Sequence, residues 1–600
     1  MGRTFGLDAF LNLHRDQLTS SGIPEIYWST LNEKIQTQLF NAGETFQLLQ
    51  IDYERERLPH EPAWGLQAIT DIDKSDPKHI YLIDHAWTFR VSHAKNQLLQ
   101  FDSLRSRLCN ILGLNDNLPK EEVAERVFTD IWKLCNTYSI GNAENIEERL
   151  PVWYVMDEIG SAVMHSDTPN CRVVPFVHVD AQITYSLLFP IADVSEEEFI
   201  FADFAEGVQD LVQKRAALLP WVPHEFDMSF EPEMPGPDYY LSGHIKESLP
   251  DLSQLNQSQN KRDKYKVFTE YSLIKEFLTD TRFEFVDEED KADILWLTCH
   301  FKDFSKLSEA PQKFVNQFPF EYVITVKDLL CLTCRKSAKT QNHSMESSKW
   351  FPVTYNLRTE IGNFVSYFQH RKGQENFWII KPYNLARSLD IHITDNLNYI
   401  MRLPATGPKI AQKYISNPVL FNRPECGSVK FDIRYVILLK SVKPLKAYVY
   451  SEFFVRFANK PFELKDFHDF EKHFTVMNYE QNVELKHMLC SEFRIFWEQQ
   501  YPNFAWEGIQ KSILGVLRTV LEGAVKEEPP CGIAHSPQSR ALYAADLMLE
   551  WGESREIQPK LLEINWTPDC KRACQYYPNF YNDIFKLLFL DESSNVFIKL

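Results

Sequence analysis

Hydrophobic and polar positions along residues 545–568 follow a pattern that predicts two β-strands joined by a polar turn, GESREIQP. Successive side chains of a strand point to opposite faces, so Glu563 and Asn565 share one face of the second strand. Asp546 on the first strand can face them across the ladder. Two carboxylates and an amide oxygen on one face suit a hard divalent ion such as Mg²⁺, although an ordinary hairpin with a wet polar face has the same spacing.

The pattern along the rest of the chain predicts several domains, because 600 residues exceed what one hydrophobic core holds. Residues 1–75 have apolar positions at helical spacing and are predicted to be mainly helical. Residues 76–215 mix short strand-like runs with a helix, and residues 216–262 are rich in proline and polar residues, as in a linker or a wrapping arm. Alternating strands and helices return over residues 263–600, with a polar insert at 335–349 that we expect to be a mobile loop.

Composition and end signals favour the cytosol or the nucleus. The chain is 44% hydrophobic and 24% charged, has no apolar run of bilayer length and no signal region at its start, and has Gly6 where a myristoylation signal has Ser or Thr. Eleven scattered cysteines fit reduced thiols. Cys331 and Cys334 favour a packed helix over a zinc site, because no second pair stands at zinc-site spacing. We therefore expect no membrane partner.

Charge and glycine usage exclude further classes. A net charge of −19 argues against general nucleic-acid binding. Lys and Arg outnumber Asp and Glu over residues 409–460, which fits either a surface for an acidic partner or the solvated face of a sheet. With only 20 glycines, the chain has neither a Rossmann fingerprint nor a Walker-type phosphate loop.

An ordered set of motifs in the C-terminal half resembles the tubulin–tyrosine ligase-like family of ATP-grasp amino-acid ligases. The resemblance implies an α+β multidomain fold, with an ATP-grasp domain in residues 263–600. The motifs are QKFVNQFPFEYVITVKDLL (312–330), FPVTYNL (351–357), WIIKP (378–382), QKYI (412–415), KFDIR (430–434), VRFA (455–458), HFTVMNY (473–479), and the ADLML and LLEINWTP pair within 545–568.

Family enzymes use ATP and Mg²⁺ to phosphorylate a carboxylate of tubulin, and the amine of an amino acid then attacks the acyl phosphate. The resemblance therefore implies ATP and Mg²⁺ as cofactors and gives individual residues their roles. By motif, Lys381 meets phosphate oxygens, Gln412, Lys413, Tyr414 and Ile415 hold the adenine, Lys430 and Asp432 contact the nucleotide, Arg434 faces the substrate, and Asp546, Glu563 and Asn565 bind Mg²⁺.

The motifs depart from the family pattern where the phosphates are cradled. Active members follow the lysine with two glycines that let backbone amides approach the phosphates, whereas Ser388 and Asp390 stand at those positions here. Asp390 is expected to bring an unpaired carboxylate near the triphosphate and so to oppose binding. The HLTN signature keeps its His and Thr as His473 and Thr475, but Asn478 is displaced. The resemblance thus implies a ligase fold that binds nucleotide and turns over slowly or not at all.

Residues 151–207 resemble the second half of a SET domain, the lysine methyltransferase fold. Met164 replaces an asparagine that bonds the methyl donor, and Phe204 replaces a tyrosine whose hydroxyl acts at the transferring methyl group. We therefore expect a β-rich SET-like domain in residues 76–215 without methyltransferase activity; a small β-rich domain whose HSDTPN is a simple turn is the alternative. The donor segment aligns with Met164, His165, Ser166, Pro169, Asn170 and Cys171.

Three functions follow from these resemblances. The first is a pseudo-ligase that binds tubulin or microtubules, meets acidic tails through residues 409–460, and regulates tyrosination or glutamylation. The second is an active ATP- and Mg²⁺-dependent ligase on tubulin tails. The third is a chromatin-linked scaffold or histone lysine methyltransferase. We expect a cytoplasmic protein, with the centrosome, the spindle and the nucleus as further locations.

Overall fold

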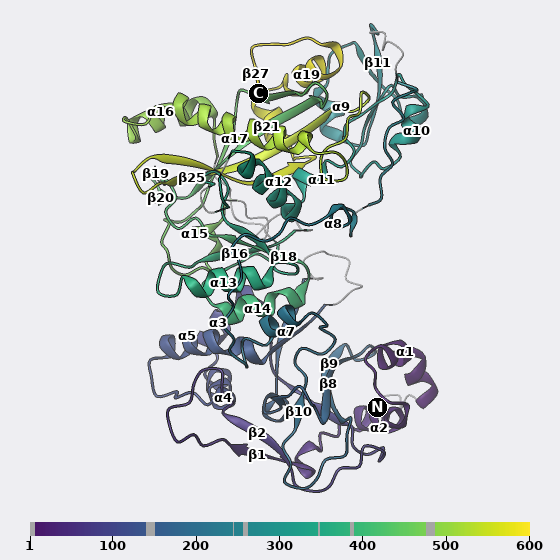
Figure 1. Cartoon of the computed structure of the whole chain (residues 1–600), viewed down its shortest axis with the longest axis vertical. Coiled ribbons are helices and arrows are strands. Elements are labelled where there is room, and N and C mark those ends of the chain that lie inside the picture. The colour runs from purple at the N-terminus through teal and green to yellow at the C-terminus, as the bar shows by residue number, and fades with distance from the viewer. Residues whose placement is uncertain are drawn as a thin grey trace. The chain divides into compact units, whose positions relative to one another are not determined.

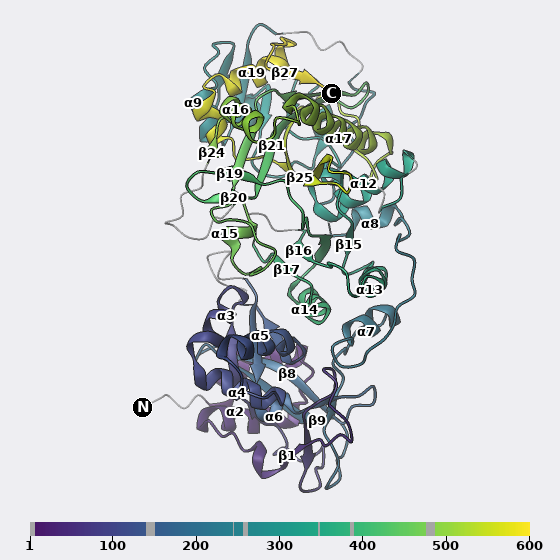
Figure 2. The same cartoon turned by 90° about the vertical axis from the view of Figure 1, so that its left-hand side faces the viewer.

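The computed structural model describes residues 6–139, 150–243, 245–255, 262–341, 343–345, 348–383, 389–475 and 487–600 (Figures 1 and 2). The chain divides into two compact units. Unit 1 comprises Met1–Met228, Ile361–Gln374 and Thr394–Pro408, and unit 2 comprises Ser229–Glu360, Glu375–Ile393 and Lys409–Leu600. Two short segments of the C-terminal half therefore belong to the N-terminal unit, while the four domain ranges drawn from the sequence stay predictions.

Unit 1 consists of small sheets covered by helices. The sheet β3-β9-β8 packs against α1 and α2 through a core that includes Phe10, Leu31 and Phe176. The helices are α1 (Leu7–Ser20), α2 (Trp28–Thr37), α3 (Val91–Gln100), α4 (Asp102–Leu112), α5 (Lys120–Asp130), α6 (Glu158–Ser161), α7 (Leu211–Ala217), α13 (Ile361–His370) and α14 (Leu397–Arg402). The strands are β1 (Phe46–Gln50), β2 (Trp64–Ala68), β3 (Tyr81–Ile83), β4 (His85–Phe89), β5 (Cys135–Tyr138), β6 (Val152–Met156), β7 (Met164–His165), β8 (Cys171–His178), β9 (Ile183–Pro190) and β10 (Phe201–Ala202).

The mainly helical prediction for residues 1–75 is wrong beyond α2. Phe46–Gln50 forms strand β1, which pairs antiparallel with β2. Phe46 is buried and Leu48 is exposed, so the apolar residues of this run do not form the buried face of a helix. Ladder pairing with a strand that is distant in sequence has overridden the local helical spacing.

Unit 2 is built around a seven-stranded sheet. It also contains a parallel sheet (β12-β11-β13-β14) and a four-stranded sheet (β15-β18-β16-β17), whose strands come earlier in the sequence. Its helices are α8 (Pro237–Leu241), α9 (Ser272–Phe277), α10 (Phe304–Ser308), α11 (Tyr322–Thr325), α12 (Lys327–Thr340), α15 (Phe470–His473), α16 (Cys490–Gln500), α17 (Trp506–Lys526), α18 (Lys571–Tyr576) and α19 (Phe580–Phe585). Its strands are β11 (Tyr265–Thr269), β12 (Phe283–Phe285), β13 (Ile294–Trp296), β14 (Phe314–Val315), β15 (Thr354–Asn356), β16 (Trp378–Pro382), β17 (His392–Thr394), β18 (Lys409–Lys413), β19 (Phe421–Arg423), β20 (Gly427–Val429), β21 (Phe431–Ser441), β22 (Lys446–Tyr450), β23 (Phe454–Phe457), β24 (His487–Met488), β25 (Ala541–Trp551), β26 (Ile557–Trp566) and β27 (Phe597–Lys599).

The long strands β21 and β25 lie inside the seven-stranded sheet and have a core on each face, while β26 pairs with β25 at the edge of the sheet. Ile433, Tyr543 and Leu547 pack with α12 and α17 on one face, and Leu438 and Leu542 pack with α18 and α19 on the other (Figure 1). The antiparallel pairing of β25 with β26 confirms the predicted hairpin around the polar turn. Burial on both faces fixes the register of these strands, which places the polar residues of the candidate site.

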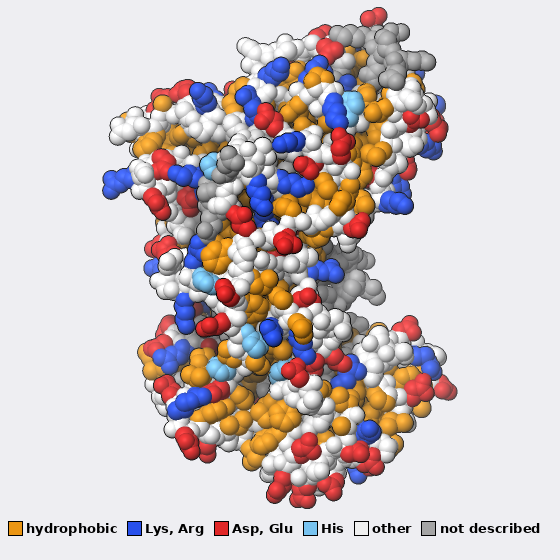
Figure 3. All heavy atoms as spheres, in the orientation of Figure 1, with side chains coloured by type: hydrophobic (Ala, Val, Ile, Leu, Met, Phe, Trp, Pro, Cys, Tyr) orange, Lys and Arg blue, Asp and Glu red, His pale blue; other side chains and the backbone are white. Residues whose placement is uncertain are grey.

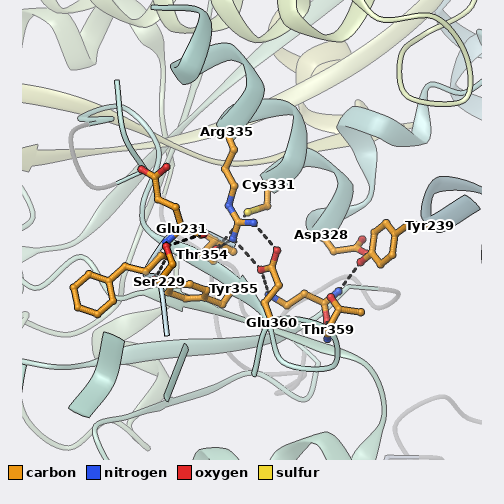
Figure 4. Close-up of polar contacts among 12 residues, drawn as sticks. Ser229, Glu231, Tyr239, Asp328, Cys331, Arg335, Thr354, Tyr355, Thr359 and Glu360 are labelled. Carbon is orange, nitrogen blue, oxygen red and sulfur yellow. Dashed lines mark hydrogen bonds and ion pairs between the residues drawn. The ribbon is translucent and has the colours of Figure 1, made fainter. Parts of the chain in front are cut away.

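The described part of the Pro-rich stretch behaves as a wrapping arm. Tyr240 is fully buried in the core of unit 2, and the hydroxyl of Tyr239 donates to Asp328 over 2.8 Å. The backbone carbonyl of Phe230 accepts from the hydroxyl of Tyr355, also over 2.8 Å. Figure 4 shows Tyr239 next to Asp328 of α12, so residues 229–241 are anchored to unit 2.

The polar insert at 335–349 was predicted to be a mobile loop, and this is wrong for its first part. Helix α12 continues to Thr340, and the buried guanidinium of Arg335 donates to Glu360 over 2.5 Å and to the carbonyl of Thr354 (Figure 4). Cys331 and Cys334 are buried on the same helix, which confirms the packed-helix interpretation. None of the described helices combines the length and apolar character needed to cross a bilayer.

Candidate functional site

A row of charged side chains crosses three neighbouring strands of unit 2. The register pairs Arg434 of β21 with Asp546 of β25, and Asp546 with Glu563 of β26. Arg434 donates through Nε and Nη2 to both oxygens of Asp546, each over 2.7 Å. The amide of Asn565 donates to Asp546 over 3.3 Å and to Glu563 over 3.1 Å. The predicted trio of Asp546, Glu563 and Asn565 is therefore brought together, but its first carboxylate already binds a guanidinium.

A second arginine, Arg456 of β23, completes the ion pairs. It donates to Asp432 over 2.7 Å and lies 3.0 Å from Asp546. Burial opposes ionisation of Asp546, which is 3% exposed, but Arg434 and Arg456 outweigh burial and hold the pKa of that carboxyl below its usual range. Asp432 also accepts a hydrogen bond from the hydroxyl of Thr475. The negative charges of Asp432 and Asp546 are thus balanced by Arg434 and Arg456 of the protein itself.

Lys381 and Lys430 are buried without such compensation. Lys381 Nζ donates to the amide oxygen of Gln412 over 2.8 Å, and Lys430 Nζ donates to the hydroxyl of Tyr414, also over 2.8 Å. Among the described residues neither has an ion-pair partner. Burial lowers the pKa of Lys381 to about 8 and that of Lys430 to about 7. Two ammonium groups held by neutral partners form a ready site for an anion.

The predicted adenine-binding segment is only partly directed toward this site. Gln412 is committed, because its amide nitrogen donates to Thr354 while its oxygen accepts from Lys381. Tyr414 joins the site through its hydroxyl, and Ile415 is buried as an apolar residue. Lys413 lies apart: its Nζ donates over 3.0 Å to the carbonyl of Glu375 and to Asn376. The hydrogen bonds of Lys413 to Glu375 and Asn376 thus differ from those of Gln412 and Tyr414, which join the two buried lysines.

The prediction that Asp390 leaves an unpaired carboxylate is wrong. Asp390 forms an ion pair with Lys409 and lies 2.9 Å from Nε2 of His392. Burial opposes its ionisation, yet these partners hold the pKa of Asp390 below its usual value. Its φ of 52° lies in the left-handed region, which favours glycine, as the motif resemblance implies for this position. Ser388 and Asn478 lie outside the described residues.

Asp390→Asn is expected to destabilise the four-stranded sheet, because it leaves the buried ammonium of Lys409 without a carboxylate. Breaking a buried pair in this way costs about 3 kcal/mol. Hydrogen exchange of the β16 and β18 amides measures the loss, with the exposed Asp395→Asn as the matched control. Equal exchange in the two variants, together with a gain in nucleotide affinity for Asp390→Asn, would restore the unpaired-carboxylate interpretation.

The charged groups fit phosphate better than they fit a metal ion. Nitrogen donors outnumber carboxylates in this neighbourhood, where Lys327 lies 3.4 Å from Glu563 and both oxygens of Asp546 are bound. Mg²⁺ needs free anionic oxygens, and adjacent guanidinium groups repel it. Within the described part of the chain, no group of three or more His, Cys, Asp or Glu side chains is placed to hold a metal. The donor set thus fits the phosphates of a nucleotide but not a tight magnesium site.

Arg456 and Lys327 are the residues that motif reasoning missed. Both belong to motifs of the C-terminal half, but no role was assigned to them. Strands β21 and β23 are antiparallel, with Asp432 opposite Arg456. A correct prediction of this strand pairing would therefore have identified Arg456. Lys327 begins α12, and its approach to Glu563 depends on helix packing that sequence spacing does not show.

The prediction of a basic surface over residues 409–460 is also wrong. Lys409, Lys430 and Lys440 are buried, and Lys440 pairs with Asp591. Only Lys443 and Lys446 are exposed among the basic residues of this stretch. On the face drawn in Figure 3, acidic and basic side chains are interspersed and form no separate basic field. Much of the positive charge of this stretch is therefore buried or paired inside unit 2 and does not form a surface.

Comparison with known proteins identifies the family. The model of the tubulin-tyrosine ligase family matches residues 305–599, and that of the tubulin tyrosine ligase SET-like domain matches residues 67–225. The chain belongs to the tubulin–tyrosine ligase family, which confirms the predicted α+β order of a SET-like domain followed by a ligase-family domain.

Three relatives match almost from end to end, and all are called tubulin–tyrosine ligase-like protein 12. The Mus musculus protein is 42% identical over 98% of this chain and 96% of its own length. The Homo sapiens protein is 42% identical over 98% and 94%, and the Caenorhabditis elegans protein is 36% identical over 98% of each chain.

Proposed function

We propose that this protein is a pseudo-ligase: it binds tubulin and adenine nucleotide on an ATP-grasp fold and regulates modification of tubulin tails without robust ligation of its own. The observation that carries the proposal is Asp546, whose oxygens bind Arg434 and Arg456 within 2.7–3.0 Å. The names of the relatives support tubulin as the partner.

The loss of catalysis follows from the needs of phosphoryl transfer. A divalent metal normally neutralises the charge that develops on the transferring phosphate and on the leaving group. By motif, Asp546, Glu563 and Asn565 are the residues that would hold such a metal in an active ligase, where it would supply this electrostatic stabilisation. Here Asp546 is bound by Arg434 and Arg456, and Glu563 lies near Lys327. The site therefore presents phosphate oxygens with fixed cations, which do not move with the reacting group as a metal ion does.

Nucleotide binding is supported by the two buried lysines. An anion near Lys381 and Lys430 gives their ammonium groups the charged partner that they lack, and charge-assisted hydrogen bonds are stronger than neutral ones. His473 and Tyr414 fix the position of Lys430, because the Tyr414 hydroxyl bonds the ring of His473 over 2.9 Å. The protein residues therefore bind and orient the phosphates without a metal.

Incubation of the full chain with tubulin, ATP, Mg²⁺ and labelled tyrosine or glutamate tests the proposal. We expect tubulin to bind and incorporation to stay at background. Incorporation that is robust and is abolished by Glu563→Gln would refute the pseudo-ligase and establish the residue as catalytic. Binding assays with tubulin from which the acidic tails have been cleaved then show whether the tails are the contact.

An active ligase on tubulin tails is the second candidate. It is favoured by the retention of Lys381, Lys430 and Arg434 around one groove, which an inactive protein has less need to keep. The incorporation assay discriminates the two, because only an active ligase attaches labelled amino acid to tubulin above background. Changing Ser388 and Asp390 together to glycine asks a narrower question: a rise in nucleotide affinity would place a defect in the phosphate loop, whereas an active ligase gains little turnover from the change. No contact among the described residues favours a histone partner, and that partner stays a prediction.

Nucleotide binding is expected to take up protons, because an anion favours the charged forms of lysines whose pKa values burial has lowered to about 7 in Lys430 and about 8 in Lys381. Affinity for ATP is therefore highest below the pKa of Lys430 and falls as the pH rises through both values. Calorimetry near pH 8 in two buffers of different ionisation enthalpy measures the uptake. Lys430→Met removes most of it; uptake that survives this change contradicts the assignment.

A further inference from the structure

Unit 1 contains a cavity of about 360 Å³, a volume typical of small-molecule sites. Strands β7 and β10, which carry the SET-like motifs, form part of its wall, and α14 contributes Arg402. Several aromatic side chains line it as well, among them Trp64, Tyr154, Phe204 and Trp221. The residues that line the cavity all belong to unit 1, and none of them is part of the charged site of unit 2.

The acidic side chains that line the cavity are already neutralised. Asp203 lies 3.5 Å from the ammonium of Lys214, and Glu206 accepts from Arg172 over 3.0 Å. Neither carboxylate is therefore left to attract a cationic ligand.

Two basic side chains of the lining have no acidic partner among the described residues. Lys133 Nζ donates to the carbonyl of Pro59 over 2.8 Å, and burial lowers its pKa to about 8. Arg402, which is half-buried in the lining, donates through Nη2 to the carbonyl of Cys135 over 2.5 Å. A cation that lines a cavity without an acidic partner favours a ligand that brings an anionic oxygen.

A continuous aromatic wall leads to Arg402. The rings of His165 and Phe204 are 5.5 Å apart, those of Phe204 and Trp221 are 4.7 Å apart, and the guanidinium of Arg402 lies 5.0 Å from the centre of the Trp221 ring. His165 Nδ1 accepts from the backbone N–H of Phe204, so the neutral ring carries its proton on Nε2 and can donate. A ligand whose flat ring lies on this wall would have its acid group close to the positively charged guanidinium of Arg402.

We propose that the cavity of unit 1 binds a small organic anion with a flat unsaturated ring, whose acid group meets Arg402 and whose ring stacks along Phe204 and Trp221. This ligand differs from the methyl donor of SET enzymes, whose sulfonium adds positive charge beside Arg402 and Lys133. The inference is independent of nucleotide binding in unit 2.

Binding of charge-matched probe pairs to the full chain tests the proposal. The probes are naphthoate with naphthamide, and adenylate with adenosine, followed by ligand-observed NMR and calorimetry. The acid of each pair is expected to bind at least about tenfold more tightly than its neutral partner, the scale of a hydrogen bond to a charged group. Arg402→Gln removes that difference, whereas Arg402→Lys keeps part of it.

Two control variants distinguish binding in this cavity from binding elsewhere on the chain. Arg172→Gln combined with Glu206→Gln removes a paired cation and anion of the same cavity without changing its net charge, and it leaves the acid preference intact. Lys381→Met alters only the groove of unit 2, so adenylate binding that survives it belongs to unit 1. Equal binding of acid and neutral probes, no acid binding at millimolar concentration, preference for S-adenosylmethionine over adenylate, or an acid preference unchanged by Arg402→Gln would each overturn the proposal.

Discussion

Asp546→Asn is expected to destabilise unit 2 by about 3–5 kcal/mol, because breaking a buried ion pair leaves the charge of the remaining partner uncompensated. Arg434 and Arg456 both bind this carboxylate, which is 3% exposed, and asparagine keeps the shape while removing the charge. Hydrogen exchange of the β21 and β25 amides is the appropriate measurement, since a chain with two units need not unfold in one step. We expect exchange there to be at least about 100-fold faster than in the unchanged protein.

The matched control is Glu563→Gln on the neighbouring strand. Glu563 is only partly buried and its cation, Lys327, is 3.4 Å away, so the loss is expected to be about 1 kcal/mol or less. A metal ligand behaves in the opposite way: Asp546→Asn would leave exchange unchanged and abolish magnesium-dependent nucleotide affinity. That result would show Asp546 to be free for a cation and would remove the basis of the pseudo-ligase proposal.

Lys381→Met is expected to weaken ATP binding by about 10- to 100-fold, the value of one or two charge-assisted hydrogen bonds to phosphate. Methionine fills a similar volume in the buried position but has no ammonium group. Because Lys381 has a neutral partner in the structure, its removal leaves no buried charge unpaired and the fold should be retained. Calorimetric titration with ATP measures the effect.

Lys413→Met is the discriminating control, because motif resemblance assigns both lysines to the nucleotide site, but only Lys381 is hydrogen-bonded to Gln412. Lys413 bonds the carbonyl of Glu375 and the side chain of Asn376, so its loss should change ATP affinity within about twofold, as for an ordinary surface substitution. A loss in Lys413→Met as large as that in Lys381→Met would show that the adenine segment binds as the motif predicts.

The sequence was sufficient where a signal is local. Alternation along residues 545–568 predicted the β25–β26 hairpin and the common face of Glu563 and Asn565, and the register confirms both. The spacing of Cys331 and Cys334 predicted a packed helix, and both thiols are buried on α12. Motif order predicted the family and the order of its domains.

The sequence failed where a residue depends on a partner far along the chain. Arg434 and Asp546 are 112 residues apart, and only the register of β21 with β25 brings them together. Asp390 looked unpaired because Lys409, on another strand, is its partner. The charge of residues 409–460 looked like a surface because a count of lysines carries no information on burial.

These corrections change the physical reason for the catalytic silence that we propose. The sequence placed the defect in a repulsive carboxylate at Asp390, whereas the structure has Asp390 paired with Lys409. The constraint instead lies at Asp546, where arginine occupies the oxygens that a metal needs. A groove of this kind can hold phosphate firmly and still lack the mobile charge compensation of phosphoryl transfer.

The sharpest single measurement is a calorimetric titration of the full chain with ATP, performed once with Mg²⁺ and once with the metal chelated. If arginine has replaced the metal at Asp546, ATP binds in both conditions with affinities that agree within about threefold. An affinity that rises about tenfold or more with Mg²⁺ would mean that the metal displaces Arg434 and Arg456 from Asp546, and the protein would then have to be regarded as a competent ligase.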